Sequence, residues 1–148
     1  MLLKIVLSLT FVILANCQCL DDDVLLNNRC YKFVKTPMNY TTALNYCVVN
    51  GYYLATLDNV VVNNFVASVA QNEFGTSNGH YYIGLYIDYF NYYWNDGTRV
   101  NYLNFQSGYP MGNDHFTAQK STGKWVSADG DDFLPFVCSR VPVETTRS

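Results

Sequence analysis

The chain carries little charge and has no concentration of positive charge. Charged residues make up 14% of its 148 residues, and the formal net charge is −3. Proteins that bind nucleic acid need a basic patch to neutralise phosphates, so this composition argues against such a partner. Disorder is also disfavoured, because 49% of the residues are hydrophobic and can bury a large apolar surface. The length favours a single domain.

Groups that commonly catalyse reactions are scarce. The only two histidines, His80 and His115, fall in segments that we expect to be loops. No serine or cysteine lies in a known nucleophile motif. We therefore expect a binding protein and not an enzyme.

Apolar runs long enough to cross a bilayer are missing. At the N-terminus, Lys4 precedes an apolar stretch over residues 5–14, and Ala15-Asn16-Cys17 resembles a cleavage site. This pattern predicts a signal peptide over residues 1–17, secretion, and a mature chain with no membrane anchor. An uncleaved anchor is the alternative.

Pairs of the form Cys-x-x-Cys are absent, which disfavours a zinc site. Loss of residues 1–17 would leave Cys19, Cys30, Cys47 and Cys138. An even number of cysteines in an oxidising compartment predicts disulfides, and four cysteines allow three connectivities. The short spacing between Cys19 and Cys30 would let them staple a hairpin of two strands, 24–26 and 30–34.

Two amphipathic segments predict helices. The first begins after Asn39, with Thr41 or Thr42 as its cap, and ends near Gly51. The second is capped by Asp58 and places apolar residues at helical spacing. Asn39-Tyr40-Thr41 is also an N-glycosylation sequon, and an unmodified Asn39 is an equally open alternative.

The remaining pattern is that of strands and turns. Residues 81–85 form a short aromatic and β-branched run, and Gly84 inside it marks a place where another part of the chain comes close. A strand is predicted over residues 52–57, and two more over 123–126 and 133–138. Asn95-Asp96-Gly97 is a hairpin-type turn signal. We expect Trp94 and Trp125 in the core.

In this order, the landmarks resemble a C-type lectin-like domain from Cys30 to Cys138. They are Cys30-Tyr31-x-Phe33, a helix with Cys47, Tyr53-Leu54-Ala55-Thr56-Leu57, Tyr82-Ile83-Gly84-Leu85, Trp94-Asn95-Asp96-Gly97, Gly108-Tyr109-Pro110, Gly123-Lys124-Trp125 and Pro135-Phe136-Val137-Cys138.

The resemblance implies an α+β fold, in which two helices flank small antiparallel sheets and a long irregular loop is inserted between the core strands. It implies disulfides Cys47–Cys138 and Cys19–Cys30, the second being typical of the family's long form. The domain would span residues 18–140, followed by a tail over 141–148. A cis bond at Pro110 is also more common in this family.

The sequence departs from the family pattern at a second internal disulfide. His115 and Gly130 stand where that pair of cysteines is usual. Because both partners are missing together, no orphan thiol is left. We expect the long loop to be less constrained as a result.

The resemblance also implies a place for calcium, beside the loop proline and after the strand tryptophan. Here Tyr109 and Met111 flank Pro110, and Val126 and Ser127 follow Trp125. A phenol and a thioether are poor ligands for a cation that prefers six to eight hard oxygens. Only Asn113 and Asp114 keep oxygen ligands near the expected place. We therefore predict no calcium here and no other cofactor. The acidic residues Asp129, Asp131 and Asp132 match no known calcium loop.

Without calcium, aromatic faces would have to bind a sugar. The chain offers Tyr86, Tyr89, Phe90, Tyr92, Tyr93 and Tyr109, of which at least two tyrosines should be exposed. The predicted ligand-binding residues are Tyr89, Tyr92, Tyr109, Met111, Asn113 and Asp114. We expect that replacing Tyr89 and Tyr92 by Ala weakens binding without lowering the melting temperature.

The first interpretation is a secreted recognition protein that binds a glycan or a protein through the long-loop face without calcium. The resemblance further implies roles such as innate immunity. One alternative is a protein-binding module with no sugar affinity. Another is a calcium-dependent lectin with displaced ligands such as Asp114 and Asp129. A glycan array with and without chelator separates the three.

Overall fold

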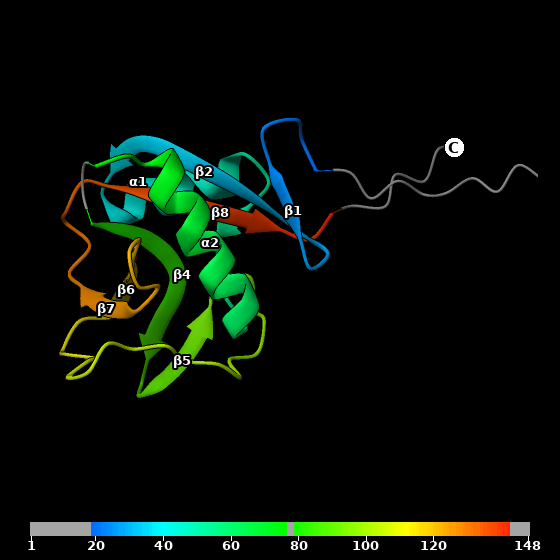
Figure 1. Cartoon of the computed structure of the whole chain (residues 1–148). Helices are drawn as coiled ribbons and strands as arrows, with labels where there is room; N and C mark the ends of the chain where they lie inside the picture. The colour runs from blue at the N-terminus through cyan, green and yellow to red at the C-terminus, as the bar shows by residue number, and fades with distance from the viewer. Residues whose placement is uncertain (1–18, 77–78, 143–148) are drawn as a thin grey trace, which may run out of the picture.

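The computed structural model describes residues 19–76 and 79–142 (Figure 1). The predicted signal peptide, residue 18 of the predicted domain and residues 143–148 of the predicted tail lie outside these ranges. The elements in chain order are β1 (Val24–Leu26), β2 (Arg29–Met38), α1 (Tyr40–Val49), β3 (Tyr53–Leu54), α2 (Val60–Glu73), β4 (His80–Asp88), β5 (Asn91–Trp94), β6 (His115–Gln119), β7 (Trp125–Ala128) and β8 (Leu134–Arg140).

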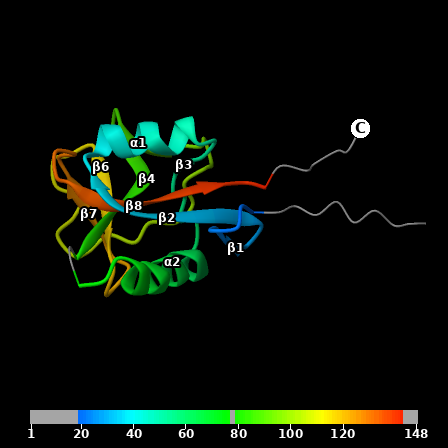
Figure 2. The ribbon, with the colours of Figure 1, turned by 90° about the horizontal axis from the view of Figure 1, so that it is seen from above.

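One eight-stranded sheet runs through the domain in the order β1-β2-β8-β4-β6-β7, with β3 added to β8 and β5 added to β4. Its ladders are antiparallel except between β4 and β8, where Tyr82 faces Phe136 in a parallel pairing. Helices α1 and α2 lie on opposite sides of β2 and β8 (Figure 2). The predicted α+β class is confirmed, and the parallel contact joins the small sheets into one mixed sheet.

Two hydrophobic clusters fill the space between the sheet and the helices. The larger contains Trp94 and Trp125, which are both buried as predicted and meet edge to face at 5.6 Å between ring centroids. The smaller lies under α1 around Cys47, Tyr82 and Phe136. In the described part of the chain, no helix is long and apolar enough to cross a membrane.

The helices begin at asparagines and not at the predicted caps. Thr42 N donates to Asn39 Oδ1 at 2.9 Å, and Val62 N donates to Asn59 Oδ1 at 3.0 Å. The predictions of Thr41 or Thr42 and of Asp58 were therefore wrong by one to three residues. Asn is as good a cap as Asp or Ser, so residue preference alone could not choose between neighbours.

Strand boundaries also differ from the sequence predictions. The strand predicted over residues 52–57 is reduced to Tyr53–Leu54, and the two last strands lie at Trp125–Ala128 and Leu134–Arg140. Residues 55–57 remain buried without strand pairing of their own. Because residues 55–57 are buried, they are mostly apolar, and an apolar run of this length is easily predicted as a strand.

Two disulfides close the chain on itself. Cys19–Cys30 has a Cα–Cα distance of 5.5 Å and attaches the segment before β1 to β2. Cys47–Cys138 has a Cα–Cα distance of 5.6 Å and joins α1 to β8 inside the smaller cluster. These are the pairs that the resemblance implied.

The position of the family's second internal disulfide is filled by a ring stack. Tyr40 stacks on His115 with 3.7 Å between centroids and an interplanar angle of 12°. Tyr40 N donates to Gly130 O at 2.9 Å, and a Cβ on Gly130 would lie 3.2 Å from both His115 and Tyr40. Gly130 thus makes room for the Tyr40 ring, and the start of β6 is held to α1 without a covalent bond.

Gly84 is the point where two parts of the backbone come closest. A Cβ at this position would lie 2.3 Å from Leu54 O. Gly84 N donates to Ala55 O at 2.8 Å, and Asn95 N donates to Gly84 O at 2.9 Å. The predicted close approach is confirmed, and it links β4 to the segment after β3 and to the turn that follows β5.

The substitution Gly84→Ala should lower the free energy of unfolding by about 3 kcal/mol, because the new methyl group overlaps a backbone carbonyl that cannot move alone. Chemical denaturation measures the loss. Gly79→Ala is the matched control, since its Cβ would meet nothing within 4 Å. Equal stability of the two variants would contradict the close approach.

Lowering the pH from about 7.5 to about 5.5 should destabilise the fold. Burial lowers the pKa of His115, against an opposing effect of Asp114, and burial also lowers the pKa of His80. The unfolded chain therefore takes up protons first as the pH falls through the ordinary histidine range. The stability is fully present above the unfolded pKa and is lost as the pH falls through the folded pKa.

Each of His115→Gln and His80→Gln should flatten the dependence of melting temperature on pH in this window, and the double variant should flatten it most. The slope is the readout, because His115→Gln also removes the ring stack with Tyr40 and lowers stability at every pH. A slope unchanged in the double variant would show that these histidines do not cause the effect.

Candidate functional site

The loop at residues 108–114 connects the long irregular segment to β6. It belongs to the yellow loop segments at the lower left of Figure 1, near β7 and the β4–β5 hairpin. The Tyr109–Pro110 bond is cis, and Gly108 and Gly112 have positive φ values of 87° and 61°. Tyr109 N donates to Gln106 O at 3.0 Å. The loop therefore turns sharply twice and presents Pro110 and Met111 outward.

Direct hydrogen bonds hold this loop to the sheet on both sides. Met111 N donates to Ser127 Oγ on β7 at 2.7 Å. Ile87 N on β4 donates to Asp114 O at 3.0 Å. The loop is thus fixed to two strands by groups of the chain itself.

The donor set does not fit a calcium ion. The Ser127 hydroxyl already accepts from Met111 N, and Val126 is buried and apolar. Over residues 19–76 and 79–142, no group of three or more His, Cys, Asp or Glu side chains is arranged to hold a metal ion. Calcium prefers six to eight oxygens with carboxylates among them, and this loop does not supply them.

Two pockets lie on opposite sides of the loop. One, of about 330 Å³, is lined by His80, Tyr109, Ser127, Asp129 and Asp132 among others. The second, of about 520 Å³, lies between the loop and the β4–β5 hairpin and includes Asp114 in its lining. Asn113 borders both. Asp114 and Asp129 therefore face different pockets, which separates the two displaced calcium ligands considered above.

Polar groups in and beside the first pocket have hydrogen-bond partners within the chain. His80 Nδ1 lies 3.3 Å from Thr117 Oγ1. Tyr82 OH donates to Asp132 O at 2.7 Å. Burial, followed by the nearby carboxylates, raises the pKa of Tyr82, so the phenol stays protonated. The acidic cluster is exposed, and Asp131 N donates to Asp129 Oδ1 at 3.1 Å.

The predicted binding residues differ in their exposure to solvent. Tyr89 is 87% exposed and Met111 is 61% exposed, while Asn113 and Asp114 are also exposed at the loop. Tyr109 is half-buried. Tyr89, Met111, Asn113 and Asp114 are therefore accessible to a ligand, as a binding role requires.

Tyr92 is half-buried and packs against the larger hydrophobic cluster. Its ring lies 5.5 Å from that of Phe105 and 6.1 Å from that of Phe116. Because its removal would take away both contacts, we expect Tyr92→Ala to lower the melting temperature, in contrast to the expectation from the sequence. Its neighbour Tyr93 points the other way, is 42% exposed and stacks on Tyr86 at 5.6 Å.

Sequence reasoning misplaced the hairpin turn at this end of the molecule. Asp88 pairs with Asn91, so Tyr89 and Phe90 form the two-residue turn between β4 and β5. The predicted turn at Asn95-Asp96-Gly97 exists, but it follows β5 and begins the long loop. Phe90 was considered among the aromatic side chains but was not selected, and Asp88 was not considered, because the turn lacks the Asn-Gly signal that marks such hairpins.

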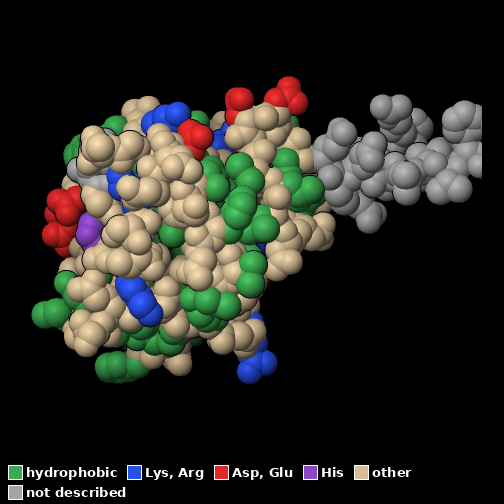
Figure 3. All heavy atoms as spheres, in the orientation of Figure 1, with side chains coloured by type: hydrophobic (Ala, Val, Ile, Leu, Met, Phe, Trp, Pro, Cys, Tyr) green, Lys and Arg blue, Asp and Glu red, His purple; other side chains and the backbone are tan. Residues whose placement is uncertain are grey.

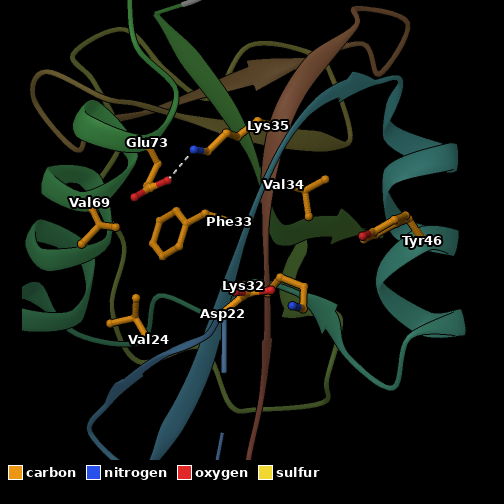
Figure 4. A pocket seen from close by; sticks show the side chains of 9 residues that line it. All are labelled: Asp22, Val24, Lys32, Phe33, Val34, Lys35, Tyr46, Val69 and Glu73. Carbon is orange, nitrogen blue, oxygen red and sulfur yellow. Dashed lines mark ion pairs between the residues drawn. The ribbon is translucent and has the colours of Figure 1, made fainter. Parts of the chain in front are cut away.

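Another pocket, of about 490 Å³, lies away from this loop along β2. In Figure 4, Phe33 and Val69 lie on the α2 side of β2, whereas Val34 and Tyr46 lie on the α1 side. An ion pair of 2.8 Å between Lys35 and Glu73 crosses its rim. The pocket is therefore a groove that straddles a strand, and its side chains do not converge on one point.

Comparison with known proteins agrees with this geometry. The family model described as "Lectin C-type domain" matches residues 36–140. The chain is 27% identical over 130 residues to Snaclec EMS16 subunit alpha of Echis multisquamatus, covering 84% of this chain and 83% of that protein. It is 29% identical over 119 residues to C-type lectin domain-containing protein 162 of Caenorhabditis elegans, covering 76% of this chain but only 37% of the relative.

Among solved structures, human lithostathine superposes with a TM-score of 0.77 at 25% identity, covering 89% of this chain and 96% of that one. Residues 36–140, which the family model matches, include both helices, the strands from β4 to β8 and the loop at residues 108–114. Domains of this type are generally binding modules without enzymatic activity. The chain belongs to the C-type lectin domain family.

Proposed function

We propose that the chain is a secreted recognition protein that binds a glycan or a protein ligand without calcium. The binding face comprises the loop at residues 108–114 and the β4–β5 hairpin. The observation that carries the proposal is the hydrogen bond from Met111 N to Ser127 Oγ. It holds the loop against β7 with a neutral group, at the place where calcium-binding relatives need charged oxygens.

The exposed side chains on this face suit contact with a ligand. Tyr89 and Met111 are largely solvent-exposed, and the pocket between loop and hairpin combines apolar walls with the carboxylates of Asp88 and Asp114. Tyrosine offers a flat apolar face and a hydroxyl group at little loss of side-chain entropy. Such a surface can bind without an ion to bridge it to the ligand.

Secretion is supported by the disulfides and by the predicted signal peptide. Both disulfides have ordinary Cα–Cα distances, and such bonds persist mainly in oxidising compartments. Asn39, the glycosylation candidate, is half-buried and uses Oδ1 as a helix cap. A glycan would attach through Nδ2, so capping and modification are compatible. A role in innate immunity belongs to this proposal as well.

A protein ligand with no sugar affinity is the second candidate. Tyr89, Phe90 and Met111 are exposed large apolar side chains on one end of the molecule, and such side chains often anchor protein interfaces. A calcium-dependent lectin with displaced ligands has less support, because Asp114 and Asp129 line different pockets.

Binding should survive removal of calcium. On a glycan array, supplemented with cell-surface proteins, the signals obtained in calcium buffer and in chelator should be equal. Calorimetric titration with millimolar calcium, which saturates extracellular calcium modules, should give no stoichiometric heat. A sugar signal lost on chelation, or stoichiometric calcium binding abolished by Asp114→Asn, would instead establish the calcium-dependent lectin.

Removing the Ser127 hydroxyl should release the loop without unfolding the domain. Ser127→Ala should cost less than about 1 kcal/mol of global stability. Amide exchange at Met111 should become faster, because its N–H loses its acceptor, and ligand affinity should fall. Ser121→Ala, an exposed serine in the turn after β6, is the matched control. Unchanged exchange at Met111 would show that Ser127 does not hold the loop.

A further inference from the structure

The turn between β4 and β5 has an unusual composition for its geometry. Tyr89 and Phe90 are its two central residues, with φ values of 45° and 76°. A two-residue turn with both central φ values positive strongly prefers Asn-Gly, because a Cβ makes the left-handed region unfavourable. Two consecutive bulky aromatic residues are the opposite of that preference.

Neither side chain compensates for this backbone by packing into the protein. Tyr89 is 87% exposed and Phe90 is 93% exposed. Hydrophobic side chains project at the lower left in Figure 3, at the end of the molecule where Figure 1 places this turn. Both the backbone and the side chains are thus unfavourable in the isolated protein. Strain of this kind concentrates at binding sites, where it presents a group to a ligand.

The turn forms one wall of the 520 Å³ pocket, and the other is formed by the loop residues Pro110, Gly112, Asn113 and Asp114. Pocket volumes of about 300–1,000 Å³ are typical of small-ligand sites, whereas protein partners need broader contact. The apolar surface comes from Tyr89, Phe90 and Pro110, and the polar groups are Asp88, Asn113 and Asp114. The pocket therefore offers ring faces beside hydrogen-bond acceptors.

The charges of the pocket restrict the ligand further. No Lys, Arg or His lines it, and within the described ranges neither Asp88 nor Asp114 takes part in an ion pair. Anionic ligands are repelled by two uncompensated carboxylates. A neutral sugar presents C–H faces that stack on aromatic rings and hydroxyl groups that donate to carboxylate and amide oxygens.

We propose that Tyr89 and Phe90 form an aromatic platform for a neutral pyranose, whose hydroxyl groups are bound by Asp88, Asn113 and Asp114. This inference rests on the proposed function and names the ligand class for one part of its face. The subsite lies between the hairpin turn and the loop, on the other side of Asn113 from Ser127 and Asp129.

The decisive variant is Tyr89→Asn combined with Phe90→Gly, which installs the residues that the turn prefers. It should raise the melting temperature and weaken sugar binding at least about tenfold. A gain in stability together with a loss of affinity would show that the two aromatic residues serve binding and not the fold. Tyr53→Asn, which removes an exposed ring on β3, is the control and should leave binding unchanged.

Binding is measured by saturation-transfer NMR with lactose, chitotriose, mannotriose and cellotriose as neutral probes. Sialyllactose serves as the anionic counterpart of lactose, and choline as a cationic probe. At least one neutral sugar should receive saturation from the wild-type protein, and sialyllactose should bind less well than lactose. Asp88→Asn and Asp114→Asn should improve sialyllactose binding relative to lactose.

Four results would overturn the platform: no neutral sugar binds, choline alone binds, sugar binding survives in the double variant, or the double variant melts lower than wild type. The last would mean that the rings support the fold. The proposed function and the platform can fail separately. If ligands from the array bind the variant with Tyr89→Asn and Phe90→Gly in chelator but do not bind the Ser127→Ala variant, the platform is rejected and the proposed function stands. Loss of all binding in chelator would reject the proposed function itself.

Discussion

The close contact between the backbone at Gly84 and the backbone at Leu54 and Ala55 organises the domain. Ala55 N donates to Val137 O and Gly84 N donates to Ala55 O, so one short segment connects β8 to β4. Gly84 O in turn accepts from Asn95 N, where the long loop begins. A side chain at residue 84 would separate these layers. The start of the long loop is therefore fixed by the absence of a single methyl group at residue 84.

Two neutral interactions stand in places where a family member could use stronger ones. A hydrogen bond between Met111 and Ser127 holds the loop, and a stack of Tyr40 on His115 occupies the place of a disulfide. Each such contact is worth about 1 kcal/mol, far less than a bound ion or a covalent bridge. The core and the two remaining disulfides then carry most of the stability, while the loop region is held by weak contacts that a ligand can adjust.

Stability and recognition have opposite requirements at the hairpin turn. The fold would be better served by Asn-Gly, whereas a ligand that stacks on aromatic rings requires Tyr89 and Phe90. The pocket places these rings across from Pro110 and beside two carboxylates that no cation of the described chain neutralises. This combination is the basis of the proposed preference for neutral, hydroxylated ligands over anionic ones.

The family, the α+β class, the burial of Trp94 and Trp125 and the close approach at Gly84 could be predicted from the chain alone, because they follow from residue types in a characteristic order. Which tyrosines are exposed could not be predicted in this way. Tyr92 and Tyr93 are neighbours of the same residue type, yet the pairing of β5 with β4 turns Tyr92 toward the core and Tyr93 outward. Neither the left-handed turn at Tyr89 and Phe90 nor the hydrogen bond from Met111 N to Ser127 Oγ could be predicted from the sequence. Each depends on strand register or on contacts between distant segments, and such contacts leave no local pattern in the chain.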